Sequence, residues 1–240
     1  MNDPLIMSIS LKPAFAEVTP VVRCSDHWLC QVRPGTAAAE RVMDFIRRRF
    51  LQAYGARPEL RPLPLMVLVN RHGTLLAAVG VRPATSERLF LEDYLDQPVE
   101  RALPEPGCCR DNIMEIAHLA GVEAGVSRLL FSAMALWLER HGMNWVVCTG
   151  TGQLHNGFQR MGIQVADLGS ARPERLADGG DDWGSYYQHN PRVMAMHVPE
   201  GLAGLRSRGL MDKVAPVSSG VESETAMTPR RAEGRYGYIA

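Results

Sequence analysis

Glu115 and His118 are the residues whose types and spacing best suit proton chemistry, because they interrupt an apolar stretch, NIMEIAHLAG (112–121), that is typical of a buried strand. A buried carboxylate is costly unless a cation or hydrogen-bond donors compensate its charge. Arg82, at the end of a predicted hairpin, is a candidate partner. Glu115 could hold a substrate amine or accept its proton, with Arg82 gripping a carboxylate or orienting Glu115. The alternative is a structural ion pair between Arg82 and Glu115, and a His118 that belongs to the core.

The alternation of side chains along a strand predicts which residues of this stretch share a face. One face carries Met114, Ile116 and His118, and the other carries Glu115, Ala117 and Leu119. We therefore expect the imidazole and the carboxylate on opposite faces of the sheet.

Two glycines open the strongest predicted helix, in the stretch GVEAGVSRLL (121–130). Free amide groups at a helix N-terminus can bind phosphate, and a glycine lets a ligand approach the backbone closely. We therefore expect a phosphate-bearing cofactor to be held by Gly121, Gly125, Val126 and Ser127. An ordinary glycine turn is the alternative interpretation.

An aromatic cluster, WGSYYQHNP (183–191), precedes the last predicted strand. Trp183, Tyr186 and Tyr187 either seal the sheet or line a substrate pocket, and one of the two tyrosines could supply a proton. A second candidate for the pocket is Glu92, in FLEDYLD, which could orient a cationic substrate. The alternative for Glu92 is a solvated acidic face of a short helix.

Metal binding is not expected. Cys24, His27 and Cys30 follow one another at three-residue steps, but a structural zinc site usually needs four ligands and no second cluster lies nearby in the sequence. Cys148 lies in an apolar strand, where thiols are usually inert.

The composition limits the class of protein. The chain has 240 residues with 26 basic and 26 acidic side chains, and this balance argues against nucleic acid as a main partner. Its five cysteines include a vicinal pair, which suggests reduced intracellular thiols. The first residues lack the pattern of a secretory signal, and no apolar stretch approaches the length of a membrane span. We therefore expect a cytoplasmic protein without stable membrane insertion.

The order of the predicted elements indicates an α/β fold, with a mixed central sheet and helices on both faces. The elements are a strand at 23–32, a helix at 35–56, a hairpin at 63–84, two short helices within 86–103, a strand at 112–121, a helix at 125–142, a strand at 143–150, a helix at 151–163 and a strand at 192–198. We expect an N-terminal arm (1–20), one α/β domain (21–214) and a disordered tail (215–240) that is rich in Ser, Glu, Thr, Gly and Pro.

The combination resembles the GNAT superfamily and, within it, the acyl-homoserine-lactone synthases. VGVR supplies the glycine and arginine of their first motif as Gly80 and Arg82, and EIAH supplies Glu115, with His118 in place of an arginine. The chain is more similar to the thermostable hemolysin family, from about residue 38 to 200. The matching segments are LFLEDYLDQPVE, EIAHLA, GVSRLL, FQRMGI and WGSYY.

The resemblance implies a GNAT-like fold and an enzyme that moves an acyl group from a thioester of coenzyme A or an acyl carrier protein to a small-molecule amine. Glu115, Arg82 and His118 would then be the catalytic group, and amides near Gly125 would hold the donor. Phe158 stands where many GNAT enzymes have a general-acid tyrosine. Two other hypotheses stay open, namely a membrane-active cytolysin and a GNAT-like binding module without catalysis.

Overall fold

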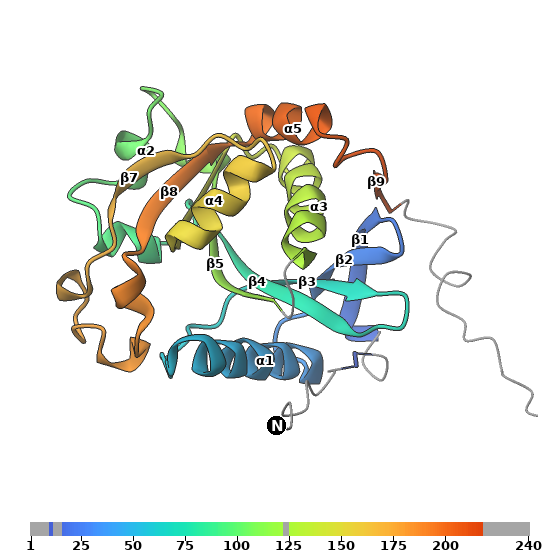
Figure 1. The fold of residues 1–240 in the computed structure, drawn as a ribbon, viewed down its shortest axis with the longest axis horizontal. Coiled ribbons are helices and arrows are strands. Elements are labelled where there is room, and N and C mark those ends of the chain that lie inside the picture. The colour runs from blue at the N-terminus through green and yellow to red at the C-terminus, as the bar shows by residue number, and fades with distance from the viewer. Residues whose placement is uncertain (1–9, 12–15, 122–124, 218–240) are drawn as a thin grey trace, which may run out of the picture.

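The computed structural model describes residues 10–11, 16–121 and 125–217. In these residues the chain forms one nine-stranded sheet with the order β7-β8-β6-β5-β4-β3-β2-β1-β9 (Figure 1). The strands are β1 (Val18–Cys24), β2 (His27–Val32), β3 (Leu65–Asn70), β4 (Leu75–Pro83), β5 (Ile113–Gly121), β6 (Trp145–Gly150), β7 (Ala166–Ser170), β8 (Arg192–His197) and β9 (Val214–Pro216). The helices are α1 (Ala37–Tyr54), α2 (Val99–Ala102), α3 (Val126–Arg140), α4 (Gly152–Arg160) and α5 (Val198–Ser207).

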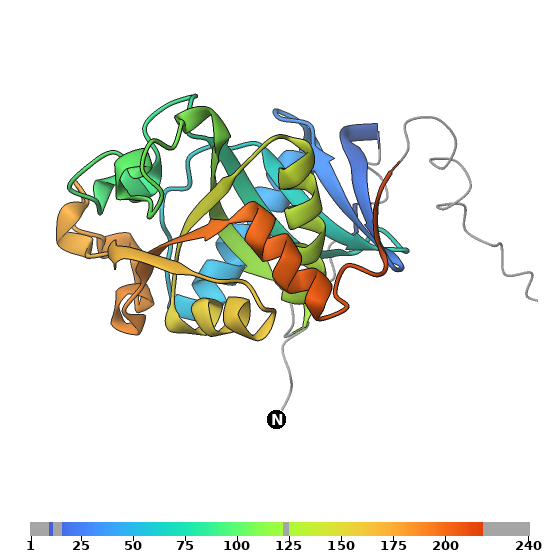
Figure 2. The same ribbon diagram turned by 90° about the horizontal axis from the view of Figure 1, so that it is seen from above.

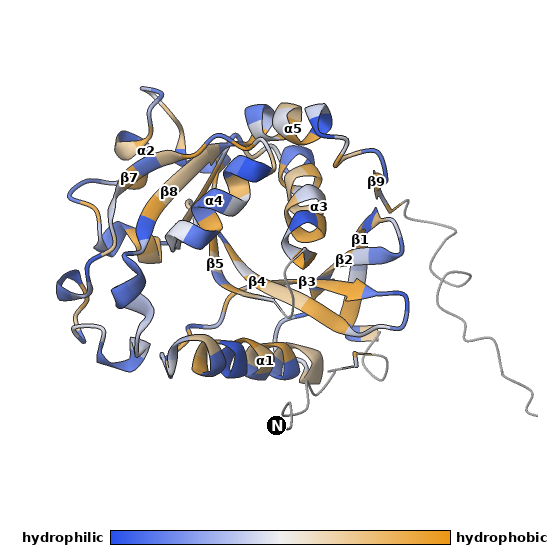
Figure 3. Ribbon diagram, viewed as in Figure 1, coloured by the Kyte–Doolittle hydropathy of each residue, from blue (hydrophilic) through white to orange (hydrophobic). Residues whose placement is uncertain are grey.

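Helices cover both faces of the sheet, which confirms the predicted mixed α/β architecture. Figures 1 and 2 show α3, α4 and α5 on one face and α1 on the other. Each face has its own hydrophobic cluster, one between α3, α5 and the sheet and one beneath α1. Strands β3 and β4 between these two clusters are predominantly hydrophobic (Figure 3). No helix in the described part of the chain is long and apolar enough to cross a membrane.

Local signals in the sequence account for the ends of α1. The Thr36 side chain accepts a hydrogen bond from the amide of Ala39, and Gly55 ends the helix with a φ of 67°. The prediction of a single strand at 23–32 was wrong, because a turn with Ser25 at a φ of 54° separates β1 from β2. Neither glycine nor proline marks that turn. Strand β1 begins within the predicted N-terminal arm, and most of the predicted tail lies outside the described residues.

Strand β5 contains a bulge at His118. Gly80 of β4 pairs with Ala117, whereas Ala78 pairs with Ala120, so β5 holds one extra residue between these pairs. His118 has a φ of 56°, and its imidazole reaches the face of the sheet that carries Glu115. The predicted alternation was therefore wrong beyond Ala117, because a bulge shifts every later side chain to the opposite face.

Strands β5 and β6 diverge after a short parallel pairing. Their register runs from the Ile113–Trp145 pair to the Ile116–Cys148 pair, while both strands continue further. All the other strand pairs in the described residues are antiparallel. The gap therefore opens at the carboxyl ends of the two parallel strands, where ligands bind in α/β sheets.

Gly80 allows the bulged histidine to lie close to β4. A Cβ atom at this position would lie 2.8 Å from Cδ1 of Leu63 and 3.3 Å from Cδ2 of His118. We expect Gly80→Ala to lower the free energy of unfolding by about 1–2 kcal/mol, since the crowded side chains must shift. The measurement is urea denaturation.

The matched control is Gly157→Ala in α4, where a Cβ atom would meet nothing within 4 Å. This substitution should raise the free energy of unfolding by about 0.5–1 kcal/mol through helix propensity. Equal stability of Gly80→Ala and the parent protein would contradict the close packing at the bulge.

Candidate active site

A cavity of about 740 Å³ occupies the gap between β5 and β6. This volume suits a small-molecule ligand. Strand β5 contributes Glu115 and the run from Ile116 to Leu119 to the lining, and β6 contributes Cys148, Thr149 and Gly150. Beyond Ile116 the edge of β5 that faces β6 has no strand partner, so backbone groups of the bulge border the cavity.

One end of the cavity is apolar and lies beneath α3, α4 and α5. Phe131 and Phe158 lie there with their ring centroids 4.7 Å apart. Met134, Met161 and Leu205 extend this surface. Two cations, Arg128 and Arg160, line the cavity on the same side of the sheet.

The other end of the cavity lies on the α1 side of the sheet and is aromatic and acidic. Its rings belong to Tyr54, Phe90, Tyr94, Trp183 and Tyr186. Its charged side chains are Glu59, Arg61, Asp93 and Asp178, apart from Glu115 in the strand. The charges of the lining therefore separate, with arginines at the helical end and an excess of carboxylates at the aromatic end.

The predicted aromatic cluster forms part of this wall. Trp183 and Tyr186 line the cavity with ring centroids 5.3 Å apart, and the Tyr186 ring meets that of Tyr54 at 5.2 Å. Tyr187 lies behind the lining, where its hydroxyl is 2.7 Å from the hydroxyl of Tyr94. The cluster is held to α1 by a hydrogen bond from the Ser185 amide to the Tyr54 carbonyl.

Tyr186 combines burial with a free hydroxyl. Its side chain is 8% exposed, and its hydroxyl forms no hydrogen bond with any other residue that the structure describes. Burial, with smaller contributions from Tyr94 and Tyr54, raises the pKa of the phenol above its usual range. Tyr186 is therefore protonated at neutral pH.

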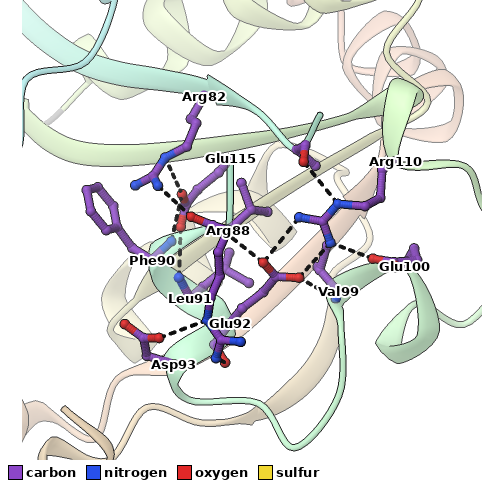
Figure 4. Close-up of polar contacts among 12 residues, drawn as sticks. Arg82, Arg88, Phe90, Leu91, Glu92, Asp93, Val99, Glu100, Arg110 and Glu115 are labelled. Atoms are coloured by element: carbon purple, nitrogen blue, oxygen red, sulfur yellow. Dashed lines mark hydrogen bonds and ion pairs between the residues drawn. The ribbon is translucent and has the colours of Figure 1, made fainter. Parts of the chain in front are cut away.

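Glu115 holds the loop that carries Phe90. It is only 2% exposed, and its two oxygens accept hydrogen bonds from the amides of Phe90 (3.1 Å) and Leu91 (2.9 Å) (Figure 4). Nε of Arg82 lies 3.3 Å from the same carboxylate. Burial raises the pKa of Glu115, and the Leu91 amide and Arg82 oppose this increase.

Arg82 is buried and does not line the cavity. Its guanidinium lies over the ring of Phe90, 3.6 Å from the ring centroid, and its Nη1 donates to the Arg88 carbonyl at 2.7 Å. The structure thus brings Arg82 and Glu115 together as predicted, and both grip the segment that begins at Arg88.

Glu92, predicted as a pocket residue, lies outside the cavity lining. Its carboxylate accepts hydrogen bonds from the amides of Leu89 (2.8 Å) and Val99 (2.9 Å), and from Nη1 of Arg110 (2.7 Å) (Figure 4). Burial alone would raise the pKa of Glu92, but the Arg110 and amide hydrogen bonds lower it to about 2. The carboxylate of Glu92 therefore stabilises the same loop that Glu115 holds.

His118 lies on the aromatic side, beside Phe90, at 5.5 Å between ring centroids. Its Nε2 is 3.3 Å from the carbonyl oxygen of Arg61, an arrangement that requires the proton on Nε2. Burial lowers the pKa of His118 to about 4, so the imidazole is neutral at pH 7.

Two of the four residues predicted to hold a cofactor line the cavity. Gly125, with a φ of 102°, and Ser127 line the cavity at the start of α3, whereas Gly121 and Val126 do not. Residues 122–124, between β5 and α3, lie outside the described part of the chain.

Sequence reasoning missed Tyr54, Tyr94 and Asp178. Tyr54 belongs to the apolar stripe of α1, which indicated only core packing. Asp178 lies in an irregular segment whose position depends on contacts with the residues that follow α1, such as the hydrogen bond from the Arg57 amide to the Asp182 carbonyl. The sequence signals for this wall were the aromatic cluster WGSYYQHNP and the acidic character of LFLEDYLD.

Replacement of Glu92 by Gln tests the carboxylate that holds the loop. Its pKa is about 2 in the folded protein, below its ordinary value of 4.5. The stabilisation is therefore fully present above pH 4.5 and is lost as the pH falls towards 2. We expect Glu92→Gln to lower the free energy of unfolding at pH 7 by about 3 kcal/mol, because Arg110 loses a buried partner.

Thermal denaturation between pH 7 and pH 2 measures this effect. Glu92→Gln should lose less stability than the parent protein over the acidic range. The control is Asp96→Asn, since the Asp96 side chain is 91% exposed in its ion pair with Arg175. Parallel pH profiles for Glu92→Gln and the parent would contradict the assignment.

Comparison with solved structures shows a GNAT-like fold. The acyl-homoserine-lactone synthase LasI superimposes with a TM-score of 0.53 at 11% identity, covering 75% of this chain and 94% of LasI. FeeM, an N-acyl amino acid synthase from uncultured soil microbes, gives a TM-score of 0.53 at 13% identity, covering 81% and 99%. A comparison with curated proteins found no match. The sequence model of the thermostable hemolysins matches residues 32–202, and the chain therefore belongs to the thermostable hemolysin family.

Proposed function

We propose that this protein is an acyltransferase that moves an acyl group from a thioester of coenzyme A or an acyl carrier protein to a small-molecule amine. The observation that carries the proposal is the cavity that passes through the gap between β5 and β6, with an apolar end and a polar end. Such a passage lets a fatty acyl chain and a polar acceptor meet at the strand edge. FeeM, which shares the fold, is named for a product with an acyl group on nitrogen.

The helical end suits the donor. Its apolar surface between Phe131, Phe158 and Leu205 fits an alkyl chain. Arg128 and Arg160 line the same side and would attract the phosphate of a pantetheine-bearing carrier. The start of α3 at Gly125 and Ser127 adds backbone amides near this end.

The bulge in β5 suits the reacting carbonyl. The edge of β5 from Ala117 to Leu119 faces the cavity without a strand partner. Amide groups on such an edge would donate hydrogen bonds to the oxygen of the thioester as it gains negative charge. The amine nitrogen then bonds to the carbonyl carbon, the carbon–sulfur bond breaks, and the amine loses one proton while the leaving thiolate gains one.

Two groups at the aromatic end are proposed for the proton transfers. Tyr186 keeps its proton at neutral pH and presents a free hydroxyl, so it would protonate the leaving thiolate. His118 is neutral and would take the proton of the attacking amine. A pKa of about 4 makes it a weak base, which suits the acidic nitrogen of a tetrahedral intermediate rather than a free ammonium group.

Glu115 and Arg82 receive a positioning task in this proposal. Both oxygens of Glu115 are already bonded to the amides of Phe90 and Leu91, so the carboxylate is poorly placed to take a proton from a substrate. Together the two residues fix Phe90 at the cavity wall. This replaces the expectation that Glu115 accepts the proton of the amine.

Gly201→Leu tests the place of the acyl chain. Gly201 of α5 lines the cavity, and a Cβ atom there would approach Cγ2 of Ile163 at 3.7 Å. A leucine would fill the apolar end, so kcat/KM with a dodecanoyl-CoA donor should fall at least about tenfold. The rate with acetyl-CoA should not change. Release of free thiol in the presence of an amine pool is the readout.

The control is Ala203→Leu, an exposed position on the same helix, which should leave both rates unchanged. Equal loss with long and short donors in Gly201→Leu would contradict this place for the chain. Absence of thiol release from every CoA or carrier-protein donor in the parent protein would overturn the proposed function itself.

Tyr186→Phe tests the proton donor. The substitution keeps the buried ring and removes only a hydroxyl that has no hydrogen-bond partner among the described residues, so the melting temperature should stay the same. We expect kcat to fall about 100-fold with little change in the KM for the acyl donor. Tyr187→Phe is the control, because its hydroxyl serves Tyr94 instead of the cavity. Similar losses of kcat in both variants would remove the special role of Tyr186.

A further inference from the structure

The aromatic end of the cavity has more carboxylates than the neighbouring arginines pair with. Asp93 pairs with Nε of Arg88 at 3.1 Å, and Glu115 is paired with Arg82. Asp178, by contrast, accepts only a backbone hydrogen bond from Gly180 at 3.0 Å and has no ion pair within the described residues. Asp178 is exposed at the edge of this end, so it is free to meet a cation that arrives from solvent.

Glu59 adds to the same excess. It lines this end of the cavity from an exposed position and has no ion pair among the residues that the structure describes. Arg61 is the one arginine among the described lining residues at this end, and its guanidinium lies over Phe90, 5.2 Å from the ring centroid. Carboxylates therefore outnumber cations in the lining at this end, and their electrostatic potential favours a positively charged ligand.

The rings around Asp178 suit a cation as well. Aromatic faces attract ammonium and guanidinium groups, most strongly where water is excluded. Tyr94 lies within reach of the carboxylates, since burial and then the charges of Asp93 and Asp178 raise the pKa of its phenol. Tyr54, Trp183 and Tyr186 complete the wall through edge-to-face and tilted contacts.

A polar side chain without a hydrogen-bond partner in the described part of the chain also lines this space. The Tyr186 side chain is more than nine-tenths buried, it lines the cavity, and its hydroxyl has no hydrogen-bond partner in the described residues. Polar groups inside proteins are normally satisfied, so a hydroxyl that opens onto a cavity marks a place where a ligand can supply the missing bond.

We infer that the acceptor is an amine with a second positive charge, such as a diamine, a polyamine or a basic amino acid. The inference rests on the proposed function, because it names the substrate of the same site. The amine that attacks the thioester must be unprotonated, so it cannot itself satisfy a carboxylate as a cation. Asp178 and the aromatic wall hold the second cation, and the free amine reaches the strand gap near His118.

Binding in the absence of any acyl donor tests this inference. The probes are 1,5-diaminopentane and pentylamine, which have the same chain length and differ by one ammonium group. Isothermal titration should show that the diamine binds at least about fivefold more tightly at low ionic strength. Asp178→Asn should remove this preference. Asp181→Asn, in an exposed residue of the same segment outside the lining, should retain it.

Equal affinities for the two probes, absence of diamine binding, or an unchanged preference in Asp178→Asn would overturn the inference. The same probes in the thiol-release assay separate it from the proposed function. Failure of the proposed function appears as diamine binding without thiol release from any donor. Failure of the inference appears as transfer to pentylamine with the same kcat/KM as transfer to the diamine.

Discussion

Two buried carboxylates hold the irregular loop that forms one wall of the cavity, and the site depends on them. Glu115 accepts amides at the start of the 3₁₀ turn Phe90–Asp93, and Glu92 accepts amides on both sides of it. A loop of this kind has no helix or strand to satisfy its amides, so charged acceptors take that place. Arg82 and Arg110 make the burial of the two charges tolerable, since an unpaired carboxylate would be far more costly.

The divergence of β5 from β6 opens the cavity that the anchored loop lines. A continuous sheet would separate the apolar space under α3 and α5 from the aromatic space beside α1. Parallel pairing stops after Ile116, and the bulge at His118 turns that side chain towards Phe90. The backbone edge of β5 therefore borders both spaces. Sheet register and loop anchoring together define the site.

The elements with strong local signals were predictable, and the features that depend on distant contacts were not. Helix α1 has a capping threonine and a terminal glycine, and the apolar run of β5 made the Glu115–Arg82 pair predictable as neighbours. The bulge escaped prediction, because it depends on the register against Gly80, which one strand's sequence does not contain. Tyr54 and Asp178 escaped for the same reason, since each faces the cavity only after the segment before β8 packs on α1.

For the proposed acyl transfer, Cys148 shows why direct attack by the amine fits the site better than a covalent acyl-cysteine intermediate. Its position at the last β5–β6 pair, in the cavity lining, would allow a thiol to take the acyl group before the acceptor does. Burial, however, raises the pKa of Cys148 to about 12, so the thiolate that would attack a thioester is scarce at neutral pH. The neighbouring charge of Glu115 acts in the same direction. In the proposed transfer, the amine bound at the aromatic end therefore attacks the thioester carbonyl directly across the gap, without an acyl-cysteine intermediate.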